Sequence, residues 1–334
     1  MEEVDSFKLE LHKAVRYKNV EALLSLCDNT SKKSIILDFK GHYNHNKKLV
    51  HYAAEFGSLE LLKMLVDLGA SVREKTRTGK NTLHIACEEG KTNIVDYLLQ
   101  TVSDSSFKSE LSTSYDKNDY RNSFYYAATS GNISSVQSLK DNGNLDIDEV
   151  LPNKSTALFT LVMDNHYEAV KLLCQCGADV NLGIQGHHFR PIHYLAERKH
   201  RTEMLKLLLK YGANVNENWE NPPYGHHPLF LALLHKLSEN AKILLENGSN
   251  ISFKGRATHI GWIDCFCFAA MNCPSLIRYF LKRGANPNIE HEGNSVLMIA
   301  FDSYAEENDL IALIKAGASK GKDGKTAIQC CKTY

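Results

Sequence analysis

The chain has 334 residues, of which 43% are hydrophobic and 23% are charged, a balance typical of a folded globular protein. Lys and Arg together number 39, as do Asp and Glu, so the net charge is zero. This balance argues against a general attraction to nucleic acid or to an anionic membrane. No run approaches the roughly 18 apolar residues of a membrane-spanning helix, and the acidic N-terminus MEEVDSFKLE does not resemble a signal peptide.

The nine cysteines show no regular framework spacing, so we interpret them as reduced thiols that serve as small core residues. This favours an intracellular, cytoplasmic location, or the host cytoplasm if the protein is an effector of a pathogen. We expect protein partners, with no nucleic-acid partner and no membrane partner.

The best-formed stretch of the chain runs from Gly79 to Leu99, GKNTLHIACEEGKTNIVDYLL. It predicts a short helix from Thr82, a turn at Gly90, and a second helix with an apolar face that includes Ile94 and Leu98. The whole is a helix–turn–helix unit of about 33 residues, and such a unit cannot bury its apolar face alone.

An apolar residue equivalent to Leu83 recurs along nearly the whole chain, which indicates stacked repeats. The equivalents are Leu11, Val50, Leu83, Phe124, Leu158, Ile192, Leu229, Phe266, Leu297 and Ile328. We expect those from Leu11 to Leu297 to lie in the core, and Ile328 to be left partly uncovered at the end of the stack.

The motifs NTLHIA, LVHYAA and PIHYLA at helix starts, and LGASV, CGADVN, YGANVN, NGSNIS, RGANPN and AGASK at repeat ends, resemble those of ankyrin repeats. The resemblance covers Leu11 to Ile328, although the family's TPLH tetrapeptide is nowhere intact. It implies an all-α solenoid of helix pairs with projecting hairpin loops. It also implies a concave groove, formed by hairpin tips and first helices, that binds another protein. Members rarely act as enzymes through their repeats alone, and no cofactor is expected.

We predict one array over residues 1–334, in which the first repeat caps the stack with Phe7, Leu9, Leu11, Ala14 and Val15 facing the core. The predicted repeats are 7–39, 40–72, 73–100, 117–148, 149–181, 182–216, 217–252, 253–288 and 289–319, followed by a half repeat at 320–334. The polar segment 101–116 is an exposed insertion, with one helical turn at Ser109 to Leu111. The half repeat is either a short cap or a sign that the chain is part of a longer protein.

Three loops, before the sixth, seventh and eighth repeats, combine aromatic residues with His or Arg, the residue types that dominate binding hot spots. We predict that they bind the partner through His187, His188, Phe189, Arg190, Trp219, Tyr224, His226, His227, Phe253, Arg256, His259 and Trp262. The alternative is that these aromatics pack between neighbouring loops and stiffen them. The paired histidines could also make the affinity depend on pH.

His259, Cys265, Cys267 and Cys273 are residue types that bind zinc, but they lack the paired spacing of structural zinc sites, and a core role is favoured. No nucleophile elbow, phosphate-binding loop, dinucleotide fingerprint or metalloprotease motif is present. The basic run from Arg198 to Arg201 lies at a turn and is interpreted as a solvated cluster. We therefore predict no catalytic residues.

Asn181 and Asn216 follow a pattern resembling that modified by asparaginyl hydroxylases in ankyrin repeats. Asn at such a position also forms hydrogen bonds with the hairpin backbone, and the two roles are compatible.

The leading functional hypothesis is a non-enzymatic protein-binding module. Two alternatives remain: a substrate adaptor of a ubiquitin ligase, if a C-terminal box follows, and a host-directed effector with a cryptic Cys/His site.

Overall fold

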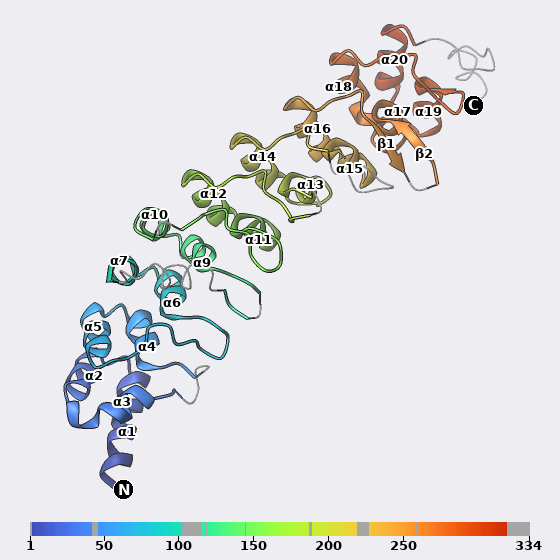
Figure 1. The fold of residues 1–334 in the computed structure, drawn as a ribbon. Helices are drawn as coiled ribbons and strands as arrows, with labels where there is room; N and C mark the ends of the chain where they lie inside the picture. The colour runs from blue at the N-terminus through green and yellow to red at the C-terminus, as the bar shows by residue number, and fades with distance from the viewer. Residues whose placement is uncertain are drawn as a thin grey trace. The chain divides into compact units, whose positions relative to one another are not determined.

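The computed structural model describes residues 2–41, 46–101, 115–117, 119–143, 145–186, 189–218, 227–257 and 259–318. Within it the chain divides into two compact units, residues 1–179 and residues 180–334. Each unit is an array of antiparallel helix pairs (Figure 1). The prediction of one continuous array over 1–334, with its repeat boundaries, stays a prediction.

The described residues of the first unit form five helix pairs. They are α1 (Glu2–Arg16) with α2 (Val20–Cys27), α4 (Leu49–Phe56) with α5 (Leu59–Asp67), α6 (Thr82–Glu88) with α7 (Thr92–Thr101), α9 (Ser123–Thr129) with α10 (Ile133–Asp141), and α11 (Ala157–Asp164) with α12 (Tyr167–Gln175). A 3₁₀ turn (Thr30–Lys32) and α3 (Lys33–Asp38) follow the first pair.

As far as the second unit is described, it forms four pairs: α13 (Pro191–Ala196) with α14 (Thr202–Lys210), α15 (Pro228–Leu234) with α16 (Ser238–Glu246), α17 (Cys265–Asn272) with α18 (Ile277–Lys282), and α19 (Val296–Asp302) with α20 (Glu307–Lys315). Pro274 starts a 3₁₀ turn at Pro274–Leu276 that leads into α18, a position where proline is tolerated because the first-turn N–H has no helical partner. Within this unit the first helices of the pairs form one row and the second helices another (Figure 1).

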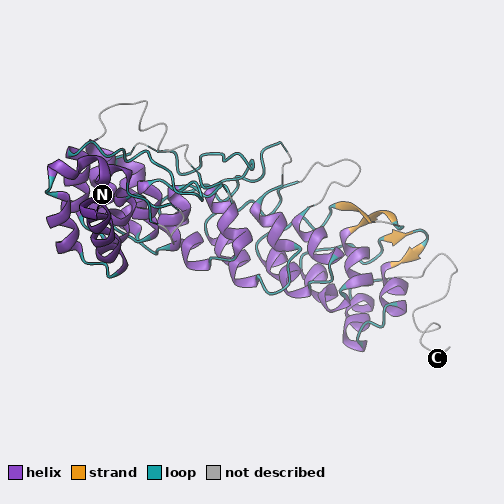
Figure 2. Cartoon of the chain, turned by 90° about the horizontal axis from the view of Figure 1, so that it is seen from below, coloured by secondary structure: helices purple, strands orange, loops and turns teal. Residues whose placement is uncertain are grey.

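Two short hairpins join helix pairs in the second unit: β1 (Lys254–Ala257) pairs antiparallel with β2 (Gly261–Asp264), and β3 (Glu290–His291) with β4 (Asn294–Ser295). The strands lie on one side of the helices of this unit (Figure 2). The fold remains that of an α-solenoid, since each sheet has only two strands.

The recurring apolar residues form the core as predicted: each of those from Leu11 to Leu297 is buried. Ile328 and the predicted helical turn at Ser109 to Leu111 lie outside the described residues. In the first repeat Phe7, Leu11 and Ala14 are buried, but Leu9 is 54% exposed, which contradicts its predicted core role. It lies two residues from both Phe7 and Leu11, and a helix turns about 200° over two residues, away from the buried face.

The repeat ends stop their helices as the Gly-Ala motifs predict. Gly69 follows α5 with φ +92°, and the amide of Ala70 donates to Leu65 O at 2.8 Å, closing the helix end. Ala213 and Ser249 close α14 and α16 in the same way, by donating to Leu208 O and Leu244 O. Among the described residues no helix is long and apolar enough to cross a membrane.

Candidate functional site

Buried histidines at helix starts hold the loops in place. The Nδ1 atom of His193 accepts from the Arg190 amide at 3.0 Å, and Nε2 lies 3.0 Å from Glu217 O in the next loop. Because Nδ1 is an acceptor, Nε2 carries the proton and donates. His51 makes the equivalent bonds with the Lys48 amide and Glu74 O. Each histidine therefore ties a first helix to the loop of the following repeat.

The hairpin β1–β2 has one face packed on the helices and one face turned outward. Gly255, Ala257 and Ile263 are buried on the inner face. A Cβ at Gly255 would lie 2.4 Å from the Phe230 ring of α15, so only glycine permits this approach. The inner face is thus fixed by close contact with the preceding repeat.

The outer face of β1–β2 carries two of the predicted partner-binding residues. Arg256 lies directly opposite Trp262 in the strand register, and the Trp262 side chain is 60% exposed. His259 is exposed near the tip of the hairpin, with φ +71°. The hairpin therefore presents an exposed Trp262 across from Arg256, with His259 near its tip.

Phe253 and His227 lie beneath this hairpin rather than on its outer face. Their rings stack at 4.9 Å, and Phe253 also meets the Phe230 ring edge-on at 6.4 Å. His227 is only 2% exposed, and burial, together with nearby His193, lowers its pKa to about 4. His227 therefore does not present a surface to a partner, which corrects its predicted role. For these two residues the stiffening interpretation describes the contacts better.

The loop before α13 brings Phe189 and Arg190 to a half-buried position. Phe189 stacks on His193 at 5.8 Å and pairs with Ile184 in a single β-bridge. A Cβ at Gly183 would lie 1.9 Å from Phe189 O, so the loop depends on that glycine. Arg190 Nε lies 3.3 Å from Glu217 Oε1. The other predicted residues of these loops, His187, His188, Trp219, Tyr224 and His226, lie outside the described residues.

Comparison with known proteins identifies these repeats. The family model for ankyrin repeats matches residues 11–109, 105–184 and 184–254, which together cover most of the chain. The chain belongs to the ankyrin-repeat family. The ankyrin repeat domain of Bcl-3, a solved structure, aligns with a TM-score of 0.53 and 20% identity, covering 80% of this chain and 98% of that one. This likeness supports the ankyrin fold.

Curated ankyrin proteins of several kinds are similar in sequence. Human ankyrin repeat and SOCS box protein 6 is 25% identical over 288 residues, which are 77% of this chain and 63% of the relative. The mouse B-cell lymphoma 3 protein homolog is 27% identical over 207 residues, covering 62% of this chain and 37% of the relative. The chain thus spans less than two thirds of the length of either protein.

The two asparagines predicted as modification sites link successive ankyrin repeats. Asn181 Nδ2 donates to Gly212 O at 3.1 Å, and its Oδ1 accepts from the Asn214 amide at 2.7 Å. Asn216 makes the equivalent bonds to Gly248 O at 3.2 Å and from the Asn250 amide at 2.7 Å. We call such a pair of bonds an Asn rung. The hairpin role is therefore observed, while hydroxylation stays a prediction.

Cys265, Cys267 and Cys273, the cysteines in the described part of the second unit, are core residues, in line with the favoured interpretation. Cys265, Cys267 and Cys273 are buried, whereas His259 is exposed near the hairpin tip. Burial raises the pKa of all three thiols, that of Cys267 to about 12. Among the described residues no three His, Cys, Asp or Glu side chains form a cluster that could hold a metal ion.

Two ion pairs in the first unit were not predicted from the sequence. Lys80 Nζ lies 2.8 Å from both carboxylate oxygens of Glu88 and 4.3 Å from the centre of the Tyr126 ring. Lys47 pairs with Glu55 in the same way at 2.9 Å. In both repeats the lysine precedes the glutamate by eight residues, and this shared spacing was the available signal.

Proposed function

We propose that this ankyrin-repeat protein acts by binding a protein partner through the outer face of β1–β2 and the neighbouring loops. The observation that carries the proposal is the 60% exposure of Trp262 opposite Arg256, on a hairpin whose other face is buried. An exposed indole gains nothing for the isolated fold, whereas Trp and Arg are the residues that most often dominate interfaces. Phe189 and Arg190 extend the proposed surface to the loop before α13.

The supporting evidence favours binding over catalysis. A cysteine nucleophile needs an exposed thiol with a lowered pKa. The cysteines of the described part of the chain are buried, and burial raises the pKa of Cys27 to about 11 and that of Cys174 to about 12.

Cross-linking mass spectrometry after affinity purification, repeated with Trp262→Ala, tests this proposal. We expect cross-links near the β1–β2 hairpin and a loss of partner capture of at least tenfold, with an unchanged circular dichroism spectrum. Tyr304→Ala is the control, because Tyr304 is 94% exposed and lies outside the proposed surface. Equal capture by the Trp262 variant and the wild type would refute the site.

A second candidate is a ubiquitin-ligase adaptor. It is favoured by the names of the relatives that contain a SOCS box, of which human protein 6 aligns over 77% of this chain. The test is whether ligase subunits co-purify with the full gene product and are lost when only residues 1–334 are expressed.

A further inference from the structure

The junction between the seventh and eighth repeats lacks an Asn rung. Asn216 forms the rung from the sixth to the seventh repeat end, and Asn288 donates to Gly317 O at 3.1 Å between the eighth and ninth. Ser252 occupies the equivalent position at the end of the seventh repeat. In the described part of the chain, no hydrogen bond joins Ser252 to the Gly284 end of the next repeat.

A second departure lies three residues earlier, at Ser249. The equivalent residue is alanine at the other Gly-Ala repeat ends: Ala70, Ala178, Ala213, Ala285 and Ala318. The Ser249 side chain is 4% exposed, and its Oγ has no hydrogen-bond partner. An unpartnered buried hydroxyl is destabilising, so the fold alone would favour alanine here.

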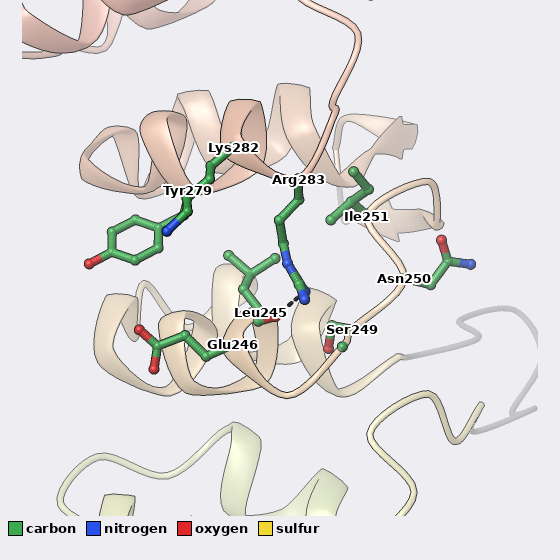
Figure 3. Close-up of a pocket in the computed structure, with 9 residues that line it drawn as sticks. Leu245, Glu246, Ser249, Asn250, Ile251, Tyr279, Lys282 and Arg283 are labelled. Carbon is green, nitrogen blue, oxygen red and sulfur yellow. Dashed lines mark hydrogen bonds between the residues drawn. The ribbon is translucent and has the colours of Figure 1, made fainter.

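A cleft of about 720 Å³ lies at this junction, between α16 and α18 (Figure 3). Leu245, Ser249 and Ile251 line it from the seventh repeat, and Tyr279, Lys282 and Arg283 from the eighth. Arg283 reaches from the end of α18 to Leu245 O, to which its Nη1 donates, and its guanidinium lies next to Ser249 (Figure 3).

The cleft is suited to a carboxylate. A guanidinium carries five N–H donors in a plane, so the bond to Leu245 O leaves donors that can grip two carboxylate oxygens. Lys282 adds a second positive charge, and together the two cations outnumber Glu246, the one acid of the lining. Tyr279 and Ile251 offer apolar surface to the stem of an acidic side chain.

We propose that this cleft binds a carboxylate of a protein partner through Arg283 and Lys282. A carboxylate held beside the guanidinium also offers an acceptor to the Ser249 hydroxyl, which accounts for a serine where five other repeat ends have alanine. The site lies between second helices, whereas β1–β2 packs on a first helix. The proposal is therefore independent of the surface around Trp262.

The test uses three peptides and the full chain. The first is acetyl-Gly-Leu-Glu-Leu-Gly-amide, the second has Gln in place of Glu, and the third has Gln and a free C-terminus. Amide chemical shifts in residues 245–252 and 279–284 report binding. We expect the Glu peptide to bind at least fivefold more tightly than the Gln amide. Stronger binding by the third peptide would identify the chain terminus as the source of the carboxylate. Equal affinities for all three would overturn the proposal.

Two variants probe the charge and the hydroxyl. Arg283→Gln keeps a polar side chain but removes the charge, and should weaken binding of the Glu peptide at least tenfold. Ser249→Ala should weaken binding of the Glu peptide about threefold without lowering the midpoint of thermal unfolding. Unchanged affinity in R283Q would refute the site, and unchanged affinity in S249A would refute the role of the hydroxyl. Tyr304→Ala is the control and should leave the peptide affinity unchanged, because Tyr304 is exposed and does not line the cleft.

The missing rung has its own test. Ser252→Asn restores the residue found at Asn216 and Asn288, so we expect a higher thermal midpoint and weaker binding of the Glu peptide as the junction closes. A higher midpoint with full peptide affinity would show that the cleft does not depend on the absent rung.

Discussion

The loop before α6 and the hairpin β1–β2 join equivalent parts of the ankyrin repeat, yet they use their cationic and aromatic residues in opposite ways. Lys80 is neutralised by Glu88 of its own repeat and covered by Tyr126. On β1–β2 the indole of Trp262, opposite Arg256, is turned to solvent. In the first arrangement the lysine has its ion pair and its ring contact within the fold. In the second, the indole is exposed to solvent. The difference separates residues that stabilise the array from residues available to a partner.

Acidification should affect both regions most strongly, because each contains a buried histidine. Burial lowers the pKa of His51 and of His227 to about 4, from 6.5. The unfolded chain therefore binds protons that the fold excludes, and stability is complete above pH 6.5 and lost as the pH falls from 6.5 to 4. Each histidine should lower the free energy of unfolding by roughly 3 kcal/mol as the pH falls from 6.5 to 4.

Urea unfolding of the wild type and of His227→Asn, at pH 7 and pH 4.5, measures this effect. The variant should lose less stability on acidification than the wild type does, and the exposed His259→Gln control should lose as much as the wild type. The same acid sensitivity in all three proteins would contradict the assignment to His227.

Gly255→Ala tests the anchoring of the hairpin. The added methyl group would lie 2.4 Å from the Phe230 ring, so we expect a loss of about 2 kcal/mol in the free energy of unfolding. Partner capture should fall as well, because the outer face would lose its fixed position. Gly261→Ala is a matched control on the other strand, where no atom lies within 4 Å of the new Cβ, although its φ of +80° adds some strain. A smaller loss in G255A than in G261A would argue against the close contact.

A double-mutant cycle on Lys80 and Glu88 tests the internal pairing. Both side chains are partly exposed, so we expect a coupling of about 0.5 kcal/mol that weakens in high salt. Partner capture should not change in either single variant. A loss of capture as large as that of Trp262→Ala would show that the first unit also contributes to the interface.

Trp262→Ala should have the smallest effect on the fold. Because the indole is 60% exposed, we expect the free energy of unfolding to change by less than about 0.5 kcal/mol. Thermal and urea unfolding measure the change. A loss above 1 kcal/mol would show that the indole packs on the fold and would weaken its assignment to a partner.

The helix pairs and their core could be predicted because the pattern is local. Leu83 and its equivalents from Leu11 to Leu297 are buried because a short repeat has to bury the same face each time. Site prediction was less complete. Trp262 and Arg256 lie on the outer face of β1–β2, and their role in partner binding stays a prediction. His227 is buried, since composition alone does not tell which face of a loop meets the next repeat.

By itself, the sequence determined the ankyrin family, the positions of the helices and the histidine and Gly-Ala motifs that organise each repeat. These follow from periodicity and from the conformational demands of short turns. Only the tertiary structure showed that Gly255 rests on Phe230, that Tyr126 of the next repeat covers Lys80, and that Ser249 lies without a partner beside Arg283. Such contacts depend on how successive repeats meet, and residues about 30 positions apart come together only when the array has stacked.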